Sequence, residues 1–169
     1  MDIPLKIGIS ACLLGQLVRY DGGHKHDPFL AETLGRLVSL VPLCPEAGCG
    51  LGIPREAMRL VGDPATPRLI TIHSGIDHTR RMEAWAARRV AELAREGLCG
   101  FILKARSPSC AVTDAPVCAA DGTPLTTGAG LFTRALMAAL PRLPLADENR
   151  LHDPLFREEF LARLRRQER

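Results

Sequence analysis

The chain has 169 residues, of which 46% are hydrophobic and 24% charged, a balance that is typical of one folded domain and not of a disordered protein. Its net charge of +3 decides little, although a protein that binds mainly to nucleic-acid phosphates usually carries clustered Lys and Arg well beyond that. No apolar run reaches the ~18 residues of a membrane span, and residues 1–10 do not resemble a signal peptide. We therefore expect a single domain over residues 1–169, in the cytoplasm and without a membrane partner, with its six cysteines reduced.

Apolar runs, capping residues and breakers predict strands that alternate with helices along the chain. Two helix starts are clear, because Asp27-Pro28 and Asp153-Pro154 each place a capping acid before a proline that suits the first helical turn. In chain order we expect a strand at 5–10, a helix at 28–38, a strand at 41–44, a short helix at 54–62, a strand at 69–73, a helix at 79–96, a strand at 101–104, an irregular or hairpin-like stretch at 111–125, a helix at 131–140 and a last helix from 154.

This alternation predicts the α/β class, as a Rossmann-like three-layer single domain with a mostly parallel sheet flanked by helices. In the first predicted helix, the residues expected to form the buried stripe include Leu37. Gly128 and Gly130 precede the helix at 131–140. They indicate either a tight turn or a helix N-terminus that is open to an anion, and both interpretations stay open.

Three cysteines lie at the carboxyl ends of predicted strands. Cys12 follows LKIGIS, Cys44 follows LVPL, and Cys110 lies in FILKARSPSC. Because open α/β folds hold their sites at the edge where the carboxyl ends of parallel strands meet, we expect the three thiols to lie together. Three thiolates suit either a zinc ion with an open position or an iron-sulfur cluster with one iron that lacks a protein ligand.

Three polar residues beside these thiols are candidates for catalysis and substrate orientation. Glu46 lies two residues after Cys44, a position that suits proton transfer, although a capping or solvated acid has the same pattern. Ser107 and Ser109 lie just before Cys110, where a hydroxyl can orient a substrate or relay a proton.

The loop after the first candidate thiol supplies further candidates. Arg19, Tyr20 and Asp21 lie there and either bind a base or a phosphate or fix the loop by hydrogen bonds. Lys104, at the end of a predicted strand, either reaches the site or covers the edge of the sheet.

The other three cysteines differ in their expected roles. Cys99 precedes its strand, so we expect it to be buried at the opposite edge and chemically inert. Cys118 lies in a stretch predicted as a loop, where it has no evident role. Cys49, in the segment CPEAGC, is a candidate fourth ligand beside Cys44.

Four segments carry a resemblance to a known family: SACLLGQLVRYDGGHK, VPLCPEAGCGLGIPRE, GIDHT and ILKARSPSC. In this order, over most of the chain, they resemble the signature segments of the domain-of-unknown-function family 523, whose characterised members are thiouracil desulfidases. The resemblance implies a 4Fe-4S cluster held by three cysteines, which match Cys12, Cys44 and Cys110. It also matches the family's acid to Glu46 and its serine to Ser107.

The same resemblance implies a reaction and a substrate. The iron without a protein ligand would take the thiocarbonyl sulfur while water attacks the carbon, without net redox change, to give a uracil product and sulfide. The implied substrate is a small molecule, either thiouracil or a thiolated uridine nucleotide, and transfer RNA is less favoured. The position of the sulfur on the ring is not implied.

Two features depart from the family pattern, and two alternatives stay open. Ala111 stands where a glycine usually follows the third cysteine, and Cys49 and Cys118 are extra thiols. Longer relatives carry a second domain after a segment like RLHDPLFREEF, so the chain resembles the desulfidase part alone.

The alternatives are a three-cysteine zinc hydrolase or deaminase-like enzyme, and a non-catalytic iron-sulfur sensor or sulfur-binding module.

Overall fold

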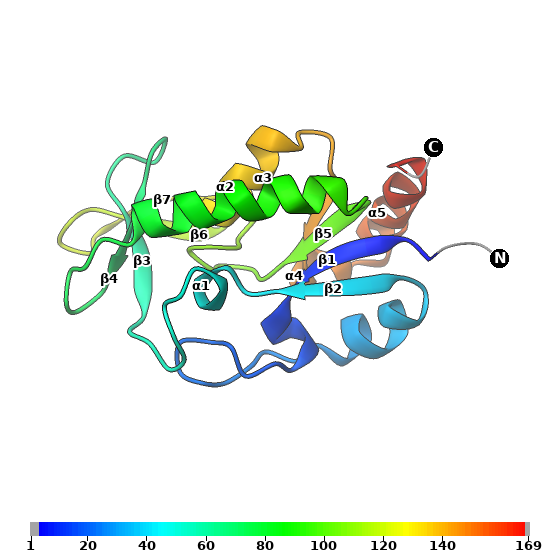
Figure 1. Ribbon diagram of the computed structural model, residues 1–169, viewed down its shortest axis with the longest axis horizontal. Coiled ribbons are helices and arrows are strands. Elements are labelled where there is room, and N and C mark those ends of the chain that lie inside the picture. The colour runs from blue at the N-terminus through cyan, green and yellow to red at the C-terminus, as the bar shows by residue number, and fades with distance from the viewer. Residues whose placement is uncertain (1–3, 168–169) are drawn as a thin grey trace.

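A wholly parallel sheet of four strands, here called sheet A, organises the larger part of the fold (Figure 1). The computed structural model describes residues 4–167, and in it the strands of sheet A lie in the order β2-β1-β5-β8. All neighbouring pairs are parallel, so the four carboxyl ends share one edge. The strands are β1 (Lys6–Ser10), β2 (Ser39–Leu43), β5 (Gly100–Leu103) and β8 (Leu145–Asp147).

Helices cover both faces of sheet A. On one face, Phe101 and Leu103 of β5 pack with apolar residues of α2 (Thr79–Arg95) and α3 (Leu131–Ala139). On the other face, Ile7 and Ile9 of β1 pack with residues of three short helical turns and two helices. These are the helical turns η1 (Ala11–Leu14), η2 (Phe29–Thr33) and η3 (Leu34–Arg36), and the helices α4 (Glu148–Leu151) and α5 (Pro154–Gln167).

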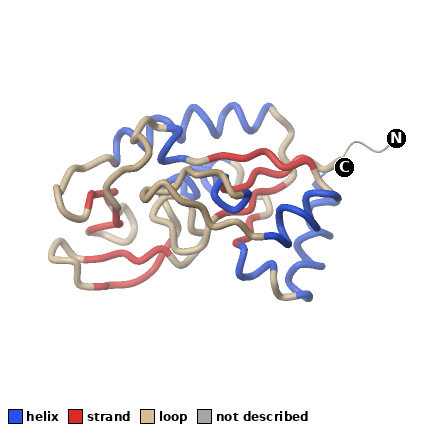
Figure 2. Tube along the Cα trace, turned by 90° about the horizontal axis from the view of Figure 1, so that it is seen from below, coloured by secondary structure: helices blue, strands red, loops and turns tan. Residues whose placement is uncertain are grey.

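A second sheet, here called sheet B, lies beside the first and was not anticipated from the sequence. Its strand order is β4-β3-β6-β7, and only the β3–β6 pair is parallel. Figure 2 shows the two groups of strands apart, with loops crossing between them. Its buried side chains pack against Met82 of α2 and Leu131 of α3. The strands are β3 (Met58–Val61), β4 (Arg68–Thr71), β6 (Ala115–Cys118) and β7 (Pro124–Gly128).

The α/β class, with a mostly parallel sheet flanked by helices, is confirmed, and two of the predicted elements need correction. The helix predicted at 54–62 is wrong, because 58–61 is strand β3, whose backbone pairs with both β4 and β6. The strand predicted at 69–73 exists as β4, but it pairs antiparallel in sheet B. In both cases the deciding contact is a long-range strand pairing, which local periodicity does not reveal.

Three further differences are local. The helix predicted at 28–38 is a π-helical turn followed by a 3₁₀ turn, and this change of period leaves Leu37 65% exposed although it was expected in the buried stripe. Cys118 ends strand β6 and is buried, so its placement in a loop is wrong. The short elements β8 and α4 were not predicted. In the stretch 111–125, the hairpin-like alternative is the right one, since β6 and β7 pair antiparallel.

Among residues 4–167, no helix combines the length and the apolar character that crossing a membrane requires.

Candidate functional site

The carboxyl edge of sheet A opens onto a cavity of about 370 Å³. Cys12 reaches it from η1, directly after β1, and Cys44 reaches it directly after β2. Cys110 reaches it from the loop that follows β5. The structure therefore brings the three predicted thiols to the lining of one cavity, together with Glu46.

The three thiols are held largely away from water. Cys12 is 8% exposed, Cys110 is 5% exposed and Cys44 is half-buried. Burial raises the pKa of all three thiols above the ordinary value, and for Cys12 the nearby charges of Arg19 and Lys104 oppose this rise. Without a cation between them, the thiols therefore stay protonated at neutral pH.

The loop that carries Cys110 is shaped by the hydroxyl of Ser107. Its Oγ accepts hydrogen bonds from the backbone N–H groups of Ser109, at 3.2 Å, and of Cys110, at 3.0 Å. The same oxygen lies on the cavity wall. Ser107 thus fixes the turn and faces the site at once.

Helix α3 binds the other side of this loop. The backbone N–H groups of Leu131 and Phe132 donate to the carbonyl oxygens of Pro108 and Ser109, each at 3.0 Å. At Gly130 a Cβ atom would lie 2.3 Å from the carbonyl carbon of Ser109, so only glycine permits this approach. The two open interpretations of the glycines before this helix are thereby decided, because loop carbonyls occupy the helix N-terminus in place of an anion.

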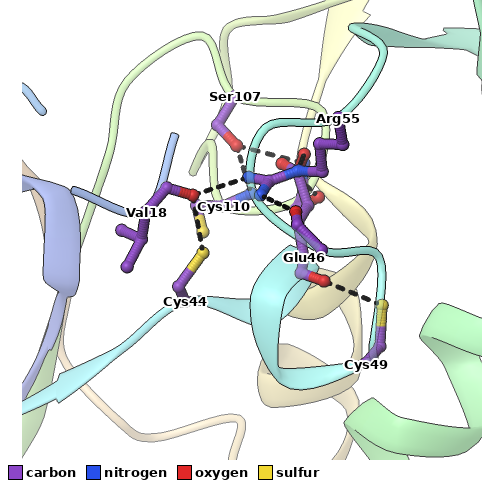
Figure 3. Close-up of polar contacts among 9 residues, drawn as sticks. Val18, Cys44, Glu46, Cys49, Arg55, Ser107 and Cys110 are labelled. Atoms are coloured by element: carbon purple, nitrogen blue, oxygen red, sulfur yellow. Dashed lines mark hydrogen bonds and ion pairs between the residues drawn. The ribbon is translucent and has the colours of Figure 1, made fainter. Parts of the chain in front are cut away.

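Glu46 is positioned by the four-residue helix α1 (Pro45–Gly48). Pro45 occupies the first helical position, and a Cβ at Gly48 would lie 2.4 Å from the Trp85 ring, so α1 packs directly on α2. The Glu46 carboxylate accepts from Arg55 Nε at 3.1 Å and from Ser109 Oγ at 3.0 Å (Figure 3). Both of its oxygens are therefore fixed at the cavity wall.

Comparisons with known proteins bear on this site. A family model described as 2-thiouracil desulfurase matches residues 7–148, a range that includes all three thiols and Glu46. The chain belongs to the 2-thiouracil desulfurase family. A solved structure, the 4Fe-4S-dependent thiouracil desulfidase TudS, is similar to it at 29% sequence identity and a TM-score of 0.69. The match covers 92% of this chain and 98% of that one, whereas the search of curated proteins gave no match.

The loop residues predicted to bind substrate are divided by the structure. Arg19 and Tyr20 line the cavity, and Arg19 Nε is buried without a hydrogen-bond partner among the described residues. Asp21 lies outside the lining, where its Oδ1 accepts from Gly23 N–H at 2.8 Å and so shapes the loop. Ser109 is fully buried behind the lining and reaches the site through Glu46. The roles of all four in this desulfurase-family chain stay predictions.

Two site residues were missed by the sequence analysis. Arg55 lies in the segment wrongly predicted as helical, and its side chain is 7% exposed. Glu148 follows the unpredicted strand β8, where its Oε2 pairs with Lys104 Nζ at 2.8 Å and its Oε1 accepts from Ala105 N–H at 2.6 Å. Lys104 itself lines the cavity, so of its two predicted positions the structure favours the site. The one local signal for Glu148 is the capping residue Asp147 before it.

The remaining cysteines lie apart from the three thiols. Cys49 Sγ donates to the backbone oxygen of Glu46 at 3.4 Å, and Figure 3 shows it across α1 from Cys44 and Cys110. It is not on the cavity lining, so the structure does not support a fourth ligand there. Cys99 is 8% exposed at the amino end of β5, which confirms the predicted burial.

The spacing of potential ligands bears on the zinc alternative. Within residues 4–167, no three His, Cys, Asp or Glu side chains converge closely enough to bind one metal ion. A cluster differs from an ion in this respect, because each thiolate bonds to a different iron and the sulfur atoms lie further apart. The arrangement of Cys12, Cys44 and Cys110 therefore gives the single-zinc site no support.

Proposed function

We propose that this protein is a 4Fe-4S-dependent desulfidase that converts thiouracil or a thiolated uridine nucleotide to the uracil product and sulfide, without net redox change. The observation that carries the proposal is the meeting of Cys12, Cys44, Cys110 and Glu46 at one cavity. Membership of the 2-thiouracil desulfurase family supports it, as does the similarity to a 4Fe-4S-dependent thiouracil desulfidase.

The residues present fit such a cluster. Cys12, Cys44 and Cys110 would hold it, since thiolates are the ligands that iron-sulfur clusters take. Arg19 and Lys104 near Cys12, and Arg55 near Cys44, favour the deprotonated thiolates that ligation requires. When bound, the cluster supplies a soft Lewis acid that prefers the sulfur of the substrate to the oxygen of the product.

The chain's own residues then move the protons of a hydrolysis. Water adds its oxygen to the thiocarbonyl carbon, the carbon–sulfur bond breaks, and the two protons of water leave with the sulfur as hydrogen sulfide. Glu46, held at the wall as an acceptor, takes a proton from the attacking water and returns one to the departing sulfur. The Ser107 hydroxyl, which faces the cavity, orients the polar edge of the base.

The lining of the cavity bears on the choice of substrate. Five basic residues line it against the one acid Glu46, and they are Arg19, Lys25, Arg55, Lys104 and Arg106. This excess favours an anionic thiolated nucleotide over the free base. A volume of about 370 Å³ is in the range of small-molecule pockets, which supports a nucleotide rather than transfer RNA.

The proposal is tested by purification without oxygen, followed by a sulfide-release assay. We expect a brown protein with broad visible absorption, four irons and four sulfides per chain, and sulfide release from 2-thiouracil, 4-thiouracil or their nucleoside monophosphates. Cys12→Ser is the matched control and should be colourless and inactive. A colourless wild-type protein that binds zinc would contradict the cluster, and a brown protein without turnover on the whole panel would instead indicate a sensor.

A further inference from the structure

Arg55 is the most completely bonded side chain of the site. Its Nε donates to Glu46 Oε1 at 3.1 Å, Nη1 to the Gly52 carbonyl at 2.9 Å and Nη2 to the Val18 carbonyl at 2.9 Å (Figure 3). Its backbone N–H also donates to the Tyr20 carbonyl at 2.8 Å. All three nitrogens of the guanidinium are therefore engaged, and the side chain is 7% exposed.

The carbonyl partners fix the guanidinium rather than the acid. Val18 belongs to the loop that covers the cavity, and its carbonyl also accepts from Cys44 Sγ at 3.7 Å. Gly52 belongs to the turn that precedes Arg55 itself. Because the guanidinium is planar, the two bonds from Nη1 and Nη2 to backbone carbonyls fix its plane and so the direction of Nε–H, which donates to Glu46.

The acid at the other end has no comparable restraint of its own. Pro45 fixes the backbone before Glu46, but three rotatable bonds still separate its carboxylate from that backbone. Ser109 Oγ holds Oε2 with a single hydroxyl, whereas Arg55 holds Oε1 with a charge-assisted hydrogen bond. The Glu46 side chain is 15% exposed, so without Arg55 solvent competes for the freed oxygen.

From this geometry we infer that Arg55 is a positioning residue, which aims the Glu46 carboxylate at the reacting centre and acts on turnover through that acid alone. The inference rests on the proposed desulfidase function. It requires the fork of arginine and not only its positive charge, because an ammonium is a point charge that cannot bind Glu46 and both carbonyls in one plane. A small displacement of a catalytic group slows chemistry far more than it weakens binding.

The test is Arg55→Lys, with Arg89→Lys as the matched control. Arg89 also bonds carboxylates, those of Glu92 and Glu96, but it does so on α2 away from the cavity. For Arg55→Lys we expect wild-type iron content and visible absorption, a kcat lowered about 10- to 100-fold and a KM within about twofold. Arg89→Lys should match the wild type in iron content, visible absorption, kcat and KM.

A double-mutant cycle separates positioning from a general loss of structure. If Arg55 acts through Glu46, then adding Arg55→Lys to Glu46→Gln should lower kcat by less than about threefold further. A full tenfold loss in that background would overturn the inference, as would wild-type kcat in Arg55→Lys or a kcat loss that only follows lost iron. If the lysine variant does not fold, the cycle is run with Arg55→Gln, and kcat is compared at saturating substrate and per cluster, because this variant also removes the charge near Cys44.

A second readout stays informative if the proposed function fails. In thermal unfolding of the anaerobically purified protein, each single variant should lower the Tm, and the double variant should unfold no lower than the less stable single variant. Absence of sulfide release in the wild type would refute the desulfidase function. This Tm pattern would still show that Arg55 and Glu46 stabilise the fold through their contact with each other. Additive Tm losses, together with sulfide release by the wild type, would refute the positioning role of Arg55 and leave the desulfidase function standing.

Discussion

The two sheets contribute to the site in different ways. Sheet A ends four parallel strands at one edge, where Cys12 after β1, Cys44 after β2 and Lys104 after β5 line the cavity. Glu148, after β8, does not line it but pairs with Lys104. Sheet B contributes one wall, through Arg55, Ala57 and Met58 at the start of β3.

The difference follows from strand direction. Parallel strands deliver all their carboxyl ends to the same edge, so groups distant in sequence meet there. In sheet B two of the three pairings are antiparallel, so successive strand ends alternate between opposite edges and no such convergence occurs. We therefore expect the loss of a thiol or acid that lines the cavity at the edge of sheet A to remove chemistry, and substitutions in sheet B away from the cavity wall to leave turnover unchanged.

The largest expected effect is the loss of a thiol at the edge of sheet A. Cys110→Ser should lose the cluster and with it all measurable sulfide release, because a hydroxyl is a poor ligand for iron in a site built from thiolates. Cys118→Ser, a buried cysteine of sheet B, is the control and should keep both. Iron and sulfide analysis with visible spectra measures this, and a fully loaded Cys110→Ser would remove Cys110 from the ligand set.

The next effect separates the acid from the cluster. Glu46→Gln keeps the size and one acceptor oxygen but removes proton transfer, so turnover should fall about 100- to 10,000-fold while the cluster stays. Glu56→Gln is the matched control, in the segment just before β3 of sheet B, where Glu56 accepts from the N–H groups of His73 and Ser74 at a turn. Wild-type sulfide release by a loaded Glu46→Gln protein would make the acid structural.

How far the sequence predicts the molecule also differs between the two sheets. The runs of mostly apolar and small residues before Cys12 and Cys44 identify two strands of the parallel sheet, and the thiols after them follow directly. Strand β3 has no such run, since MRLV follows a helix-like REA and becomes a strand only by pairing with β4 and β6. Arg55 lies just before β3, in the segment wrongly predicted as a helix, so the sequence did not identify it as a residue of the site.

Glu148 shows a second reason for failure. Its partners Lys104 and Ala105 lie more than 40 residues away, and strand β8 before it has three residues, too few for a periodic pattern. A buried acid can be recognised only from the group that it pairs with, and no rule of sequence spacing connects Glu148 to partners so far away. Motif reading thus finds groups that follow strands directly, whereas groups defined by a contact partner need the structure.

The third prediction tests this buried contact. Glu148→Ala leaves Lys104 without its carboxylate and the Ala105 N–H without its acceptor, in a place where Glu148 is 7% exposed. Breaking one side of a buried pair should lower the free energy of unfolding by about 3 kcal/mol. Urea unfolding measures it, and Glu159→Ala, an exposed acid on α5, should change stability by less than about 0.5 kcal/mol. Equal losses of unfolding free energy in Glu148→Ala and Glu159→Ala would show that the pair of Glu148 and Lys104 does not stabilise the fold.

The smallest effect is expected at the sheet B end of α2. Asp77 Oδ1 accepts from the Thr79 N–H at 2.9 Å as α2 begins, and its other oxygen pairs with Arg68 of β4. Burial alone would raise the pKa of Asp77, but the hydrogen bonds from Thr79 and Arg68 outweigh it, so the pKa is lowered in the folded protein. A lowered folded-state pKa means that the charge stabilises the fold above the unfolded pKa of aspartate, and that this stabilisation is lost as the pH falls through the folded pKa.

Asp77→Asn keeps the acceptor for Thr79 and removes the charge, which isolates this contribution. Because the pair with Arg68 is largely exposed, we expect a loss of only about 0.5–1 kcal/mol in the free energy of unfolding at pH 7. The gap between variant and wild type should narrow as the pH is lowered and close once Asp77 is protonated in both folded and unfolded chains. Turnover should not change, since the residue lies outside the cavity lining. A gap that stays constant down to acid pH would mean that the asparagine disturbs the turn itself, and a fall in turnover would show that this end of α2 is coupled to α1 and Glu46.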